Sequence, residues 1–346
     1  MRFALAAGLA GVLAAAAVAS ARDTTHGVPH GFSPEAAAAV GTRDLWVLGD
    51  YHCTGSWCLA LVRSTDAGKH FTRVALPSLP PQDTVPTLEF ANASDGFVYV
   101  EGTSPLYVTH DGGSSWHPAG PAGEVVAFAL GGGEAYAAVG HVLERSPVGR
   151  SAWRKLTITA PRLPVSLAAR ASDVWFLGQP RHRPDFDTIA RSSDRGRRFE
   201  PRKGPCLSEL GGTLTPAADG VVWAVCPSGM MAWLTLSTND GRSFSIRSFH
   251  DPGGVRQPGL INSARIAAAS AHVAVLSAGG RGALLRTTDV GRHWSRVPST
   301  ARIEEVFWLA FMTRHVGAAV VQTGPRTDQL WRTIDGGATW HSAPIR

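Results

Sequence analysis

The sequence has no stretch with the pattern of a long amphipathic helix. Its apolar residues instead fall in short runs, such as residues 45–48 and 59–62, and runs of this length are typical of β-strands. Between the runs lie many turn-forming residues, because the 346 residues include 38 glycines and 23 prolines. The pattern favours an all-β fold.

Long apolar runs are also missing, except at the N-terminus. After residue 21 no run approaches the roughly 20 apolar residues that span a bilayer. The N-terminal run starts with Met1-Arg2 and ends with Ala19-Ser20-Ala21, which is the pattern of a secretory signal peptide. We expect cleavage near Ala21, a short leader over residues 22–29, no membrane span in the mature chain, and a secreted or extracytoplasmic location in a bacterium. The alternative is an uncleaved anchor.

Several functional signatures are absent as well. The chain has no Gly-x-Ser-x-Gly elbow, no His-Glu-x-x-His pair and no phosphate-binding loop. Its formal net charge of +6 is only mildly basic, and no Lys/Arg run alternates with aromatic residues as single-strand binding requires. We therefore expect no nucleic-acid partner.

A short motif, by contrast, returns along the whole chain. Five copies read Ser/Thr-x-Asp-x-Gly-x-x-Trp/Phe, a sixth has Asn in the Asp position, and a decayed copy keeps only Ser146 and Trp153. The spacings between successive copies are 45, 37, 46, 45, 50 and 46 residues, and periods of this size indicate a propeller or a solenoid. A solenoid needs polar capping repeats, and none is visible. The Asp-position residues are Asp66, Asp111, Asp194, Asn239, Asp289 and Asp335.

We therefore predict an all-β, seven-bladed β-propeller over residues 30–346. Each blade is expected to hold four antiparallel strands, with the motif in the turn between the third and fourth strands. Within that turn, the Asp and the Ser/Thr hydroxyl can accept hydrogen bonds from nearby backbone amides. The Gly supplies a positive φ, and the aromatic ring covers the turn. We interpret the recurrent acids as structural clamps, the alternative being a catalytic or metal-binding array.

The motif resembles the Asp-box of the bacterial-neuraminidase-repeat propellers. That group includes sialidases, xyloglucan hydrolases, sortilin-type receptors and the photosystem II assembly/stability factor proteins. The resemblance to the last is closest over residues 303–341, which contain Val316-Gly-Ala-Ala-Val and Leu330-Trp-Arg-Thr-Ile-Asp-Gly-Gly-Ala-Thr-Trp-His. It covers essentially residues 30–346, and it implies a scaffold that binds protein partners without implying a photosynthetic role.

Cysteine is scarce, with four residues in all and none before Cys53, which argues against a lipoprotein anchor. Four cysteines in an exported protein indicate two disulfides. Of the three connectivities we favour local pairing, Cys53 with Cys58 and Cys206 with Cys226, the second pair within one blade. The Cys53-x4-Cys58 spacing is not that of a zinc site, so we expect no metal and no cofactor.

The loops opposite the motif turns, where propellers usually bind ligands, are rich in arginine. The planar guanidinium suits carboxylates, sulfates and phosphates, and long loops on a rigid scaffold often carry function. We therefore expect a monomeric, non-catalytic binding protein whose partner is a cell-envelope protein or an acidic glycan. The alternative is that these arginines are ordinary solvated surface cations. The candidate binding residues are Arg181, Arg183, Arg256, Arg281, Arg326 and Tyr51.

The alternative function is glycoside hydrolysis by a sialidase-like enzyme with its site over the central channel. A sialidase needs a Tyr nucleophile backed by a Glu, and of the four tyrosines only Tyr51 lies in a candidate loop. The Arg-Ile-Pro signature expected before the first Asp-box is broken at Arg302-Ile303-Glu304. Other glycosidases need two apposed carboxylates. Spacing selects no pair among Asp50, Glu101, Asp185, Asp187, Asp251 and Asp328.

Overall fold

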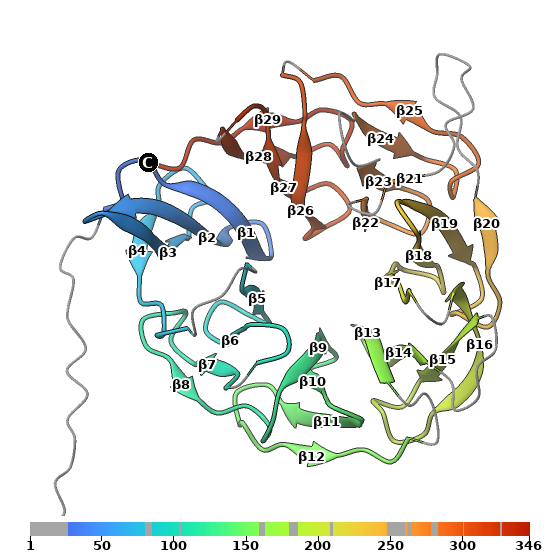
Figure 1. Cartoon of the computed structure of the whole chain (residues 1–346). Helices are drawn as coiled ribbons and strands as arrows, with labels where there is room; N and C mark the ends of the chain where they lie inside the picture. The colour runs from blue at the N-terminus through green and yellow to red at the C-terminus, as the bar shows by residue number, and fades with distance from the viewer. Residues whose placement is uncertain are drawn as a thin grey trace, which may run out of the picture.

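The computed structural model describes residues 27–79, 85–103, 105–158, 163–179, 186–207, 210–247, 260–261, 264–277, 283–299, 301–325 and 327–346. These residues form seven antiparallel sheets arranged in a ring around a central opening (Figure 1). The predicted signal peptide lies outside the described residues. The prediction of a seven-bladed, all-β propeller is confirmed.

Each blade is built from consecutive strands, which run outward from the axis in chain order. Blade 1 contains β1 (Ser33–Val40), β2 (Asp44–Cys53), β3 (Ser56–Ser64) and β4 (Thr72–Val74); blade 2 contains β5 (Thr87–Phe90), β6 (Gly96–Tyr99), β7 (Tyr107–Thr109) and β8 (His117–Pro118). Blade 3 contains β9 (Val125–Gly131), β10 (Glu134–Val139), β11 (Val142–Pro147) and β12 (Arg154–Lys155); blade 4 contains β13 (Leu163–Arg170), β14 (Asp173–Gln179), β15 (Phe186–Ser192) and β16 (Glu200–Leu207).

Blade 5 contains β17 (Thr213–Pro216), β18 (Val222–Ser228), β19 (Met231–Ser237) and β20 (Ser245–Arg247), and β21 (Leu260–Ile261) adds a fifth strand by pairing with β19. Blade 6 contains β22 (Arg265–Ala268), β23 (Ala274–Ser277), β24 (Leu284–Thr287) and β25 (Ser295–Arg296). Blade 7 contains β26 (Glu305–Phe311), β27 (Gly317–Gln322), β28 (Asp328–Thr333) and β29 (His341–Ser342).

The core lies between the blades. Seven apolar clusters of described residues fill the seven interfaces, because the nearly continuous apolar second strands bury side chains on both faces of each sheet. Between blades 1 and 2, for example, the Trp46 ring stacks on Phe90 with centroids 3.7 Å apart. The Trp46 indole N–H also donates to the carbonyl oxygen of Gly112, 2.9 Å away, so packing and hydrogen bonding both cross this interface.

The ring closes without exchanging a strand between blades 7 and 1. Side chains from β1, β2 and β3 pack against β26, β27 and β28 in one apolar cluster. The Ser33 hydroxyl donates to Asp328 at 2.8 Å, and the Phe71 amide donates to the carbonyl oxygen of Arg346 at 3.3 Å. Closure therefore depends on side-chain packing and on the docked C-terminal residues.

Both predicted disulfides are present, Cys53–Cys58 and Cys206–Cys226. The prediction that the second pair lies within one blade is wrong. Cys206 belongs to β16 of blade 4 and Cys226 to β18 of blade 5, because β16 is eight residues long and its far end packs on blade 5. Two disulfides are typical of extracytoplasmic proteins. Among the described residues, no helix has the length and apolar composition of a membrane span.

Candidate functional site

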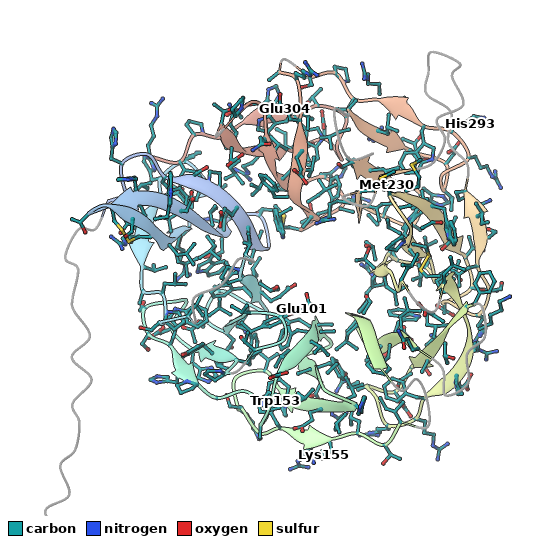
Figure 2. The ribbon with its side chains drawn as sticks, in the orientation of Figure 1. Glu101, Trp153, Lys155, Met230, His293 and Glu304 are labelled. Carbon is teal, nitrogen blue, oxygen red and sulfur yellow. A yellow bond between two sulfur atoms is a disulfide. The ribbon has the colours of Figure 1, made fainter. Side chains whose placement is uncertain are left out.

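The recurrent motifs form one set of turns, between the third and fourth strands of every blade. We call these turns the clamps, and the face that bears them the clamp face. The connections from second to third strand, and from each blade to the next, end on the opposite face, which we call the loop face. Figure 2 shows His293, from a clamp, at the outer rim of the ring and Glu101, which follows β6, at the inner edge of blade 2.

In the first clamp the acid binds its own turn. The Ser64 hydroxyl donates to Asp66 Oδ1 at 2.8 Å, and the amides of Lys69 and His70 donate to the same oxygen at 3.1 and 3.0 Å. The Gly68 amide donates to Ser64 Oγ at 2.8 Å. Hydrogen bonds from the His70 side chain and amide, together with that of Ser64, hold the pKa of Asp66 well below its usual range.

The other five acid-position residues repeat this geometry. Partial burial alone would raise the pKa of Asp335. Hydrogen bonds from the Thr339 hydroxyl and amide and from Thr333 outweigh this effect and lower the pKa to about 2. Asn239 accepts from the Ser237 hydroxyl at 2.8 Å and from the Ser243 amide at 3.0 Å. A neutral amide thus serves as well as a carboxylate, which indicates that the clamps need an acceptor and not a charge. The hydroxyl-to-acceptor distances in the three remaining copies are 2.7–2.9 Å, at Asp111, Asp194 and Asp289.

An arginine stands directly before the Ser/Thr of the motif in five of the seven copies, and each side chain reaches the next blade's clamp. Arg145 donates to the carbonyl oxygen of Arg195 at 2.5 Å, and Arg286 donates to that of Gly336 at 2.8 Å. The remaining three are Arg63 against Gly112, Arg191 against Asp240, and Arg332 against Gly68 across the ring closure. The signal was in the sequence, at a fixed offset from each motif, but the local interpretation of the motif missed it.

The five predicted binding arginines, Arg181, Arg183, Arg256, Arg281 and Arg326, lie outside the described residues. Arg181 and Arg183 fall between the end of β14 at Gln179 and the start of β15 at Phe186, and both of these strand ends lie on the loop face. The sixth candidate, Tyr51, is described near the loop-face end of β2. Its hydroxyl accepts a hydrogen bond from Arg73 at 3.1 Å, and the Arg73 guanidinium lies 5.4 Å from its ring centre. The group that hydrogen-bonds to the Tyr51 hydroxyl is thus a cation, whereas a sialidase nucleophile is backed by a Glu.

The second and third strands of blade 1 form a projecting hairpin. The pairing of β2 with β3 runs from Leu45 opposite Ser64 to Cys53 opposite Ser56. The pairing of β1 with β2 stops earlier, at Asp50. Residues 51–58, which we call the blade 1 arm, therefore extend beyond the inner strand and are cross-linked by the Cys53–Cys58 disulfide. Trp57 in this arm is 54% exposed, with its ring edge-on to His52 at 5.5 Å.

Three carboxyl groups lie near enough to interact electrostatically at the loop-face end of the seam between blades 7 and 1. A β-bulge between Pro34 and Ala36 leaves Glu35 out of the β1–β2 pairing. Burial first, and then repulsion from Asp50 and Asp328, raises the pKa of Glu35 to about 7. Asp328 accepts hydrogen bonds from Ser33 at 2.8 Å and from Gln322 at 3.2 Å. The structure thus places Asp50 and Asp328 each near a third acid, Glu35. Sequence spacing had selected no pair among the candidate acids, and Glu35 was not one of them.

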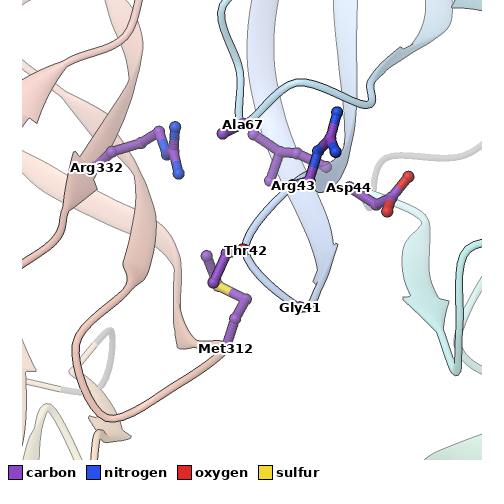
Figure 3. A pocket seen from close by; sticks show the side chains of 8 residues that line it. Gly41, Thr42, Arg43, Asp44, Ala67, Met312 and Arg332 are labelled. Atoms are coloured by element: carbon purple, nitrogen blue, oxygen red, sulfur yellow. The ribbon is translucent and has the colours of Figure 1, made fainter.

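No group of three or more His, Cys, Asp or Glu side chains among the described residues is arranged to hold a metal ion. A recess of about 180 Å³ lies on the clamp face between blades 7 and 1, lined among others by Arg43, Met312 and Arg332 (Figure 3). Most of that volume is open to solvent, and the enclosed space is about the size of one water molecule, so the recess is too small for a small-molecule ligand.

Comparison with known proteins identifies the fold but no family. No protein-family model and no curated protein matches the chain. Among solved structures, "YCF48 bound to D1 peptide" superposes with a TM-score of 0.57 at 19% identity, covering 89% of this chain and 93% of that one. A puromycin hydrolase superposes with a TM-score of 0.60 at 15% identity, but this chain covers only 54% of its length. A Mycobacterium tuberculosis puromycin-hydrolyzing peptidase gives 0.60 at 12% identity and 53% of its length.

Proposed function

We propose that this chain is an exported, non-catalytic binding propeller of the Asp-box type, close to the photosystem II assembly/stability factor proteins. The observation that carries the proposal is the contrast between the two faces. On the clamp face the acids are bound by their own turns, whereas the loop face presents Trp57 on a projecting, disulfide-linked arm. Exposed aromatic anchors on rigid supports are typical of binding surfaces.

The partner in this proposal is a cell-envelope protein or an acidic glycan. The arginines at positions 181, 183, 256, 281 and 326 supply cationic contacts, and Tyr51 and Trp57 supply aromatic ones. The YCF48 structure supports the peptide form of the proposal, since a propeller of similar length is described there with a bound peptide. Export through the N-terminal signal sequence agrees with the presence of two disulfides.

The test is capture of the partner from the native envelope fraction by immobilised protein. We expect Trp57→Ala, and separately the triple variant Arg181→Glu/Arg183→Glu/Arg256→Glu, to lose at least tenfold in captured partner with an unchanged melting temperature. The matched control reverses three exposed charges on outer strands, at Arg154, Lys155 and Arg296. Capture that survives both loop-face variants would remove the loop face as the site.

The second candidate is glycoside hydrolysis, which the carboxyl cluster at the seam favours. Enzymes of this class use two carboxyl groups in different environments, one kept protonated near neutral pH as the acid. Glu35, with its raised pKa, matches the acid, and Asp328 or Asp50 matches the second group. Turnover of fluorogenic sialosides or glucosides that is lost in Glu35→Gln and kept in Tyr51→Phe would establish this function over binding. Turnover lost in Tyr51→Phe would instead indicate a sialidase-type nucleophile.

A further inference from the structure

The outer edge of β3 in blade 1 is uncovered along much of its length. The strand spans Ser56–Ser64, but β4 pairs with it only from Leu61 to Arg63. Within the described chain no other strand pairs along this edge, so residues 56–60 form an open sheet edge. Proteins normally protect open edges with charged residues or proline, and residues 56–60 contain neither.

The pairing register determines which backbone groups of β3 point outward. Cys53 and Ser56 pair across the two-residue turn of the hairpin, and in such turns this pair exchanges both hydrogen bonds. Every second residue of β3, counted from Ser56, therefore bonds to β2. The intervening residues, Trp57 and Leu59, direct their backbone N–H and C=O groups towards the open edge. The backbone of Leu59 thus offers a donor and an acceptor to an added strand.

The other six blades cover the equivalent edge with a segment of this chain. In blades 2, 3, 6 and 7 the chain after the fourth strand runs on along the third; the Val297 amide, for example, donates to the carbonyl oxygen of Leu284 at 2.8 Å. In blade 4, β16 pairs with β15 as far as Phe186. In blade 5, β20 is short, and β21 takes the rest of the edge by pairing with β19. The molecule itself thus shows an extended segment added at this position.

In blade 1 the corresponding segment crosses to blade 2 instead. The carbonyl oxygen of Ala75 accepts a hydrogen bond from the Trp116 indole at 2.9 Å, and that of Ser78 accepts one from the Tyr107 hydroxyl at 3.0 Å. Tyr107 begins β7 and Trp116 directly precedes β8, so both donors belong to blade 2. The chain after β4 therefore joins two blades, and it does not follow β3 along the disulfide-linked blade 1 arm.

We propose that the outer edge of β3, from Ser56 to Ala60, binds an extended peptide segment of a partner protein as an added β-strand. The peptide continues the line of β4 along β3, as β21 continues the line of β20 along β19 in blade 5. Main-chain hydrogen bonds to Leu59 supply affinity, and alternate side chains supply specificity. The inference rests on the proposed function, because it specifies how the partner of that function binds.

The side chains beside the edge indicate the chemistry of the peptide. Trp57 and Leu59 share one face of β3, so the peptide residues opposite them should be apolar. Arg73 of β4 lies on the other face, where its guanidinium donates to the Tyr51 hydroxyl at 3.1 Å. A peptide residue opposite Ala60 lies on that same face beside Arg73, and an acidic side chain there would attract the guanidinium. The edge therefore fits a segment that alternates apolar residues with polar or acidic ones.

A second copy of the chain fits this edge less well than a peptide. Stable interfaces between folded proteins involve roughly 20–30 residues a side, whereas the blade 1 arm comprises only residues 51–58. An extended peptide can pair with the edge and continue over the loop face. Pairing between copies is accordingly an outcome that the test must distinguish.

The probe is a random heptapeptide library displayed on phage and panned on the wild-type protein. Enriched peptides should alternate apolar and polar residues, and the synthetic consensus peptide should slow hydrogen exchange of the Leu59 amide about tenfold. Methylating the peptide amides that face β3 should weaken binding about tenfold, whereas methylating the intervening amides should not. The proposal fails if no peptide is enriched, if the Leu59 amide is not protected, or if both sets of methyl groups act equally. Protection that rises with protein concentration in the absence of peptide would assign the edge to a second copy and overturn the proposal.

Two variants at one position separate the backbone contribution from that of the side chain. Leu59→Pro removes an amide that β2 does not use, and edge strands tolerate proline. We expect it to weaken the consensus peptide about tenfold with an unchanged melting temperature. Leu59→Ala, the matched control, keeps the amide and should retain more of the affinity. Equal losses in the two variants would contradict strand addition.

Capture from the native envelope fraction distinguishes failure of this inference from failure of the proposed function. Loss of capture in Leu59→Pro supports both. Capture that is lost in Trp57→Ala but unchanged in Leu59→Pro would overturn strand addition and leave the proposed function standing. A consensus peptide that protects Leu59, with no envelope protein captured, would contradict the proposed partner and support the edge as a peptide site.

Discussion

The guanidinium of Arg286 in blade 6 donates from Nε to the carbonyl oxygen of Gly336 in the clamp of blade 7, at 2.8 Å. The clamp hydrogen bonds described above are local, but this contact joins two clamps around the ring. Because equivalent arginines reach the next clamp from blades 1, 3, 4 and 7, the clamps couple neighbouring blades as well as closing their own hairpins.

Replacing Arg286 with Met should therefore weaken the blade 6–blade 7 interface. The variant keeps an apolar side chain but removes a charged donor, and hydrogen bonds of this kind contribute about 1.5–3 kcal/mol. Since Arg286 is partly exposed, we expect a loss of roughly 1–2 kcal/mol in the free energy of unfolding by urea. Arg296→Met, on the exposed outer strand of the same blade, should change it by less than about 0.5 kcal/mol.

Asp289→Asn tests whether a clamp needs charge. Asn239 already occupies this position in blade 5 with the same hydroxyl and amide donors, so the amide should keep most of the stability. Asp289→Ala leaves the Thr287 hydroxyl and the His293 amide without their acceptor. We expect that change to cost about 1–3 kcal/mol. Equal destabilisation by Asn and Ala in denaturant titrations would indicate that the charge itself matters.

The residue before the clamp glycine also has a positive φ in six copies, and Val290 is the least suited to it, at φ 63°. A β-branched residue is strained in this region, and two other copies have glycine there, Gly112 and Gly336. Val290→Gly should therefore raise the melting temperature, but with a gain of less than about 1 kcal/mol. The entropy cost of glycine and the loss of the Val290 packing on the blade 5–blade 6 core offset part of the relieved strain. Val297→Gly, at a buried position elsewhere in blade 6, should lower it.

The fold could be predicted because it depends on a local signal that recurs. The spacing of the clamps predicted the number of blades. The positions of Cys53 and Cys58 within one hairpin predicted the disulfide between them. Contacts between blades could not be predicted in the same way. Ser33 and Asp328 are separated by 295 positions, and the bulge that takes Glu35 out of the β1–β2 pairing leaves no composition signal. The arginine contacts were in principle predictable from their fixed offset before each motif, but their partners lie one blade away.

Two groups of acids predict opposite responses of the free energy of unfolding to pH. The clamp acids have lowered pKa values, so their stabilisation is present above the unfolded value of about 3.8 and is lost as pH falls towards 2. Burial raises the pKa values of Glu35 on β1, Glu89 on the inner strand β5 and Asp187 on β15 to about 7. Their contribution to the free energy of unfolding is fully present below about pH 4 and is lost as the pH rises through 7.

The free energy of unfolding should therefore peak near pH 4–5 and decline towards pH 8. Thermal unfolding between pH 3 and 9 measures this profile. The double variant Glu35→Gln/Asp187→Asn should flatten the decline above pH 5 and leave the acid side unchanged. A wild-type maximum at pH 7–8 would contradict the burial of these acids.

The two disulfides should differ in what they stabilise. Cys206 and Cys226 are 20 positions apart and join two blades, whereas Cys53 and Cys58 are 5 positions apart in one hairpin. Since the loss of unfolded-state entropy grows with loop length, Cys206→Ser/Cys226→Ser should lower the free energy of unfolding by about 2–4 kcal/mol. Cys53→Ser/Cys58→Ser should cost less globally, but it should free the blade 1 arm and increase hydrogen exchange in residues 51–58. If the arm positions Trp57 for a partner, Cys53→Ser/Cys58→Ser should reduce partner capture without a matching fall in melting temperature. A parallel fall in capture and in melting temperature would show that the arm acts only through stability.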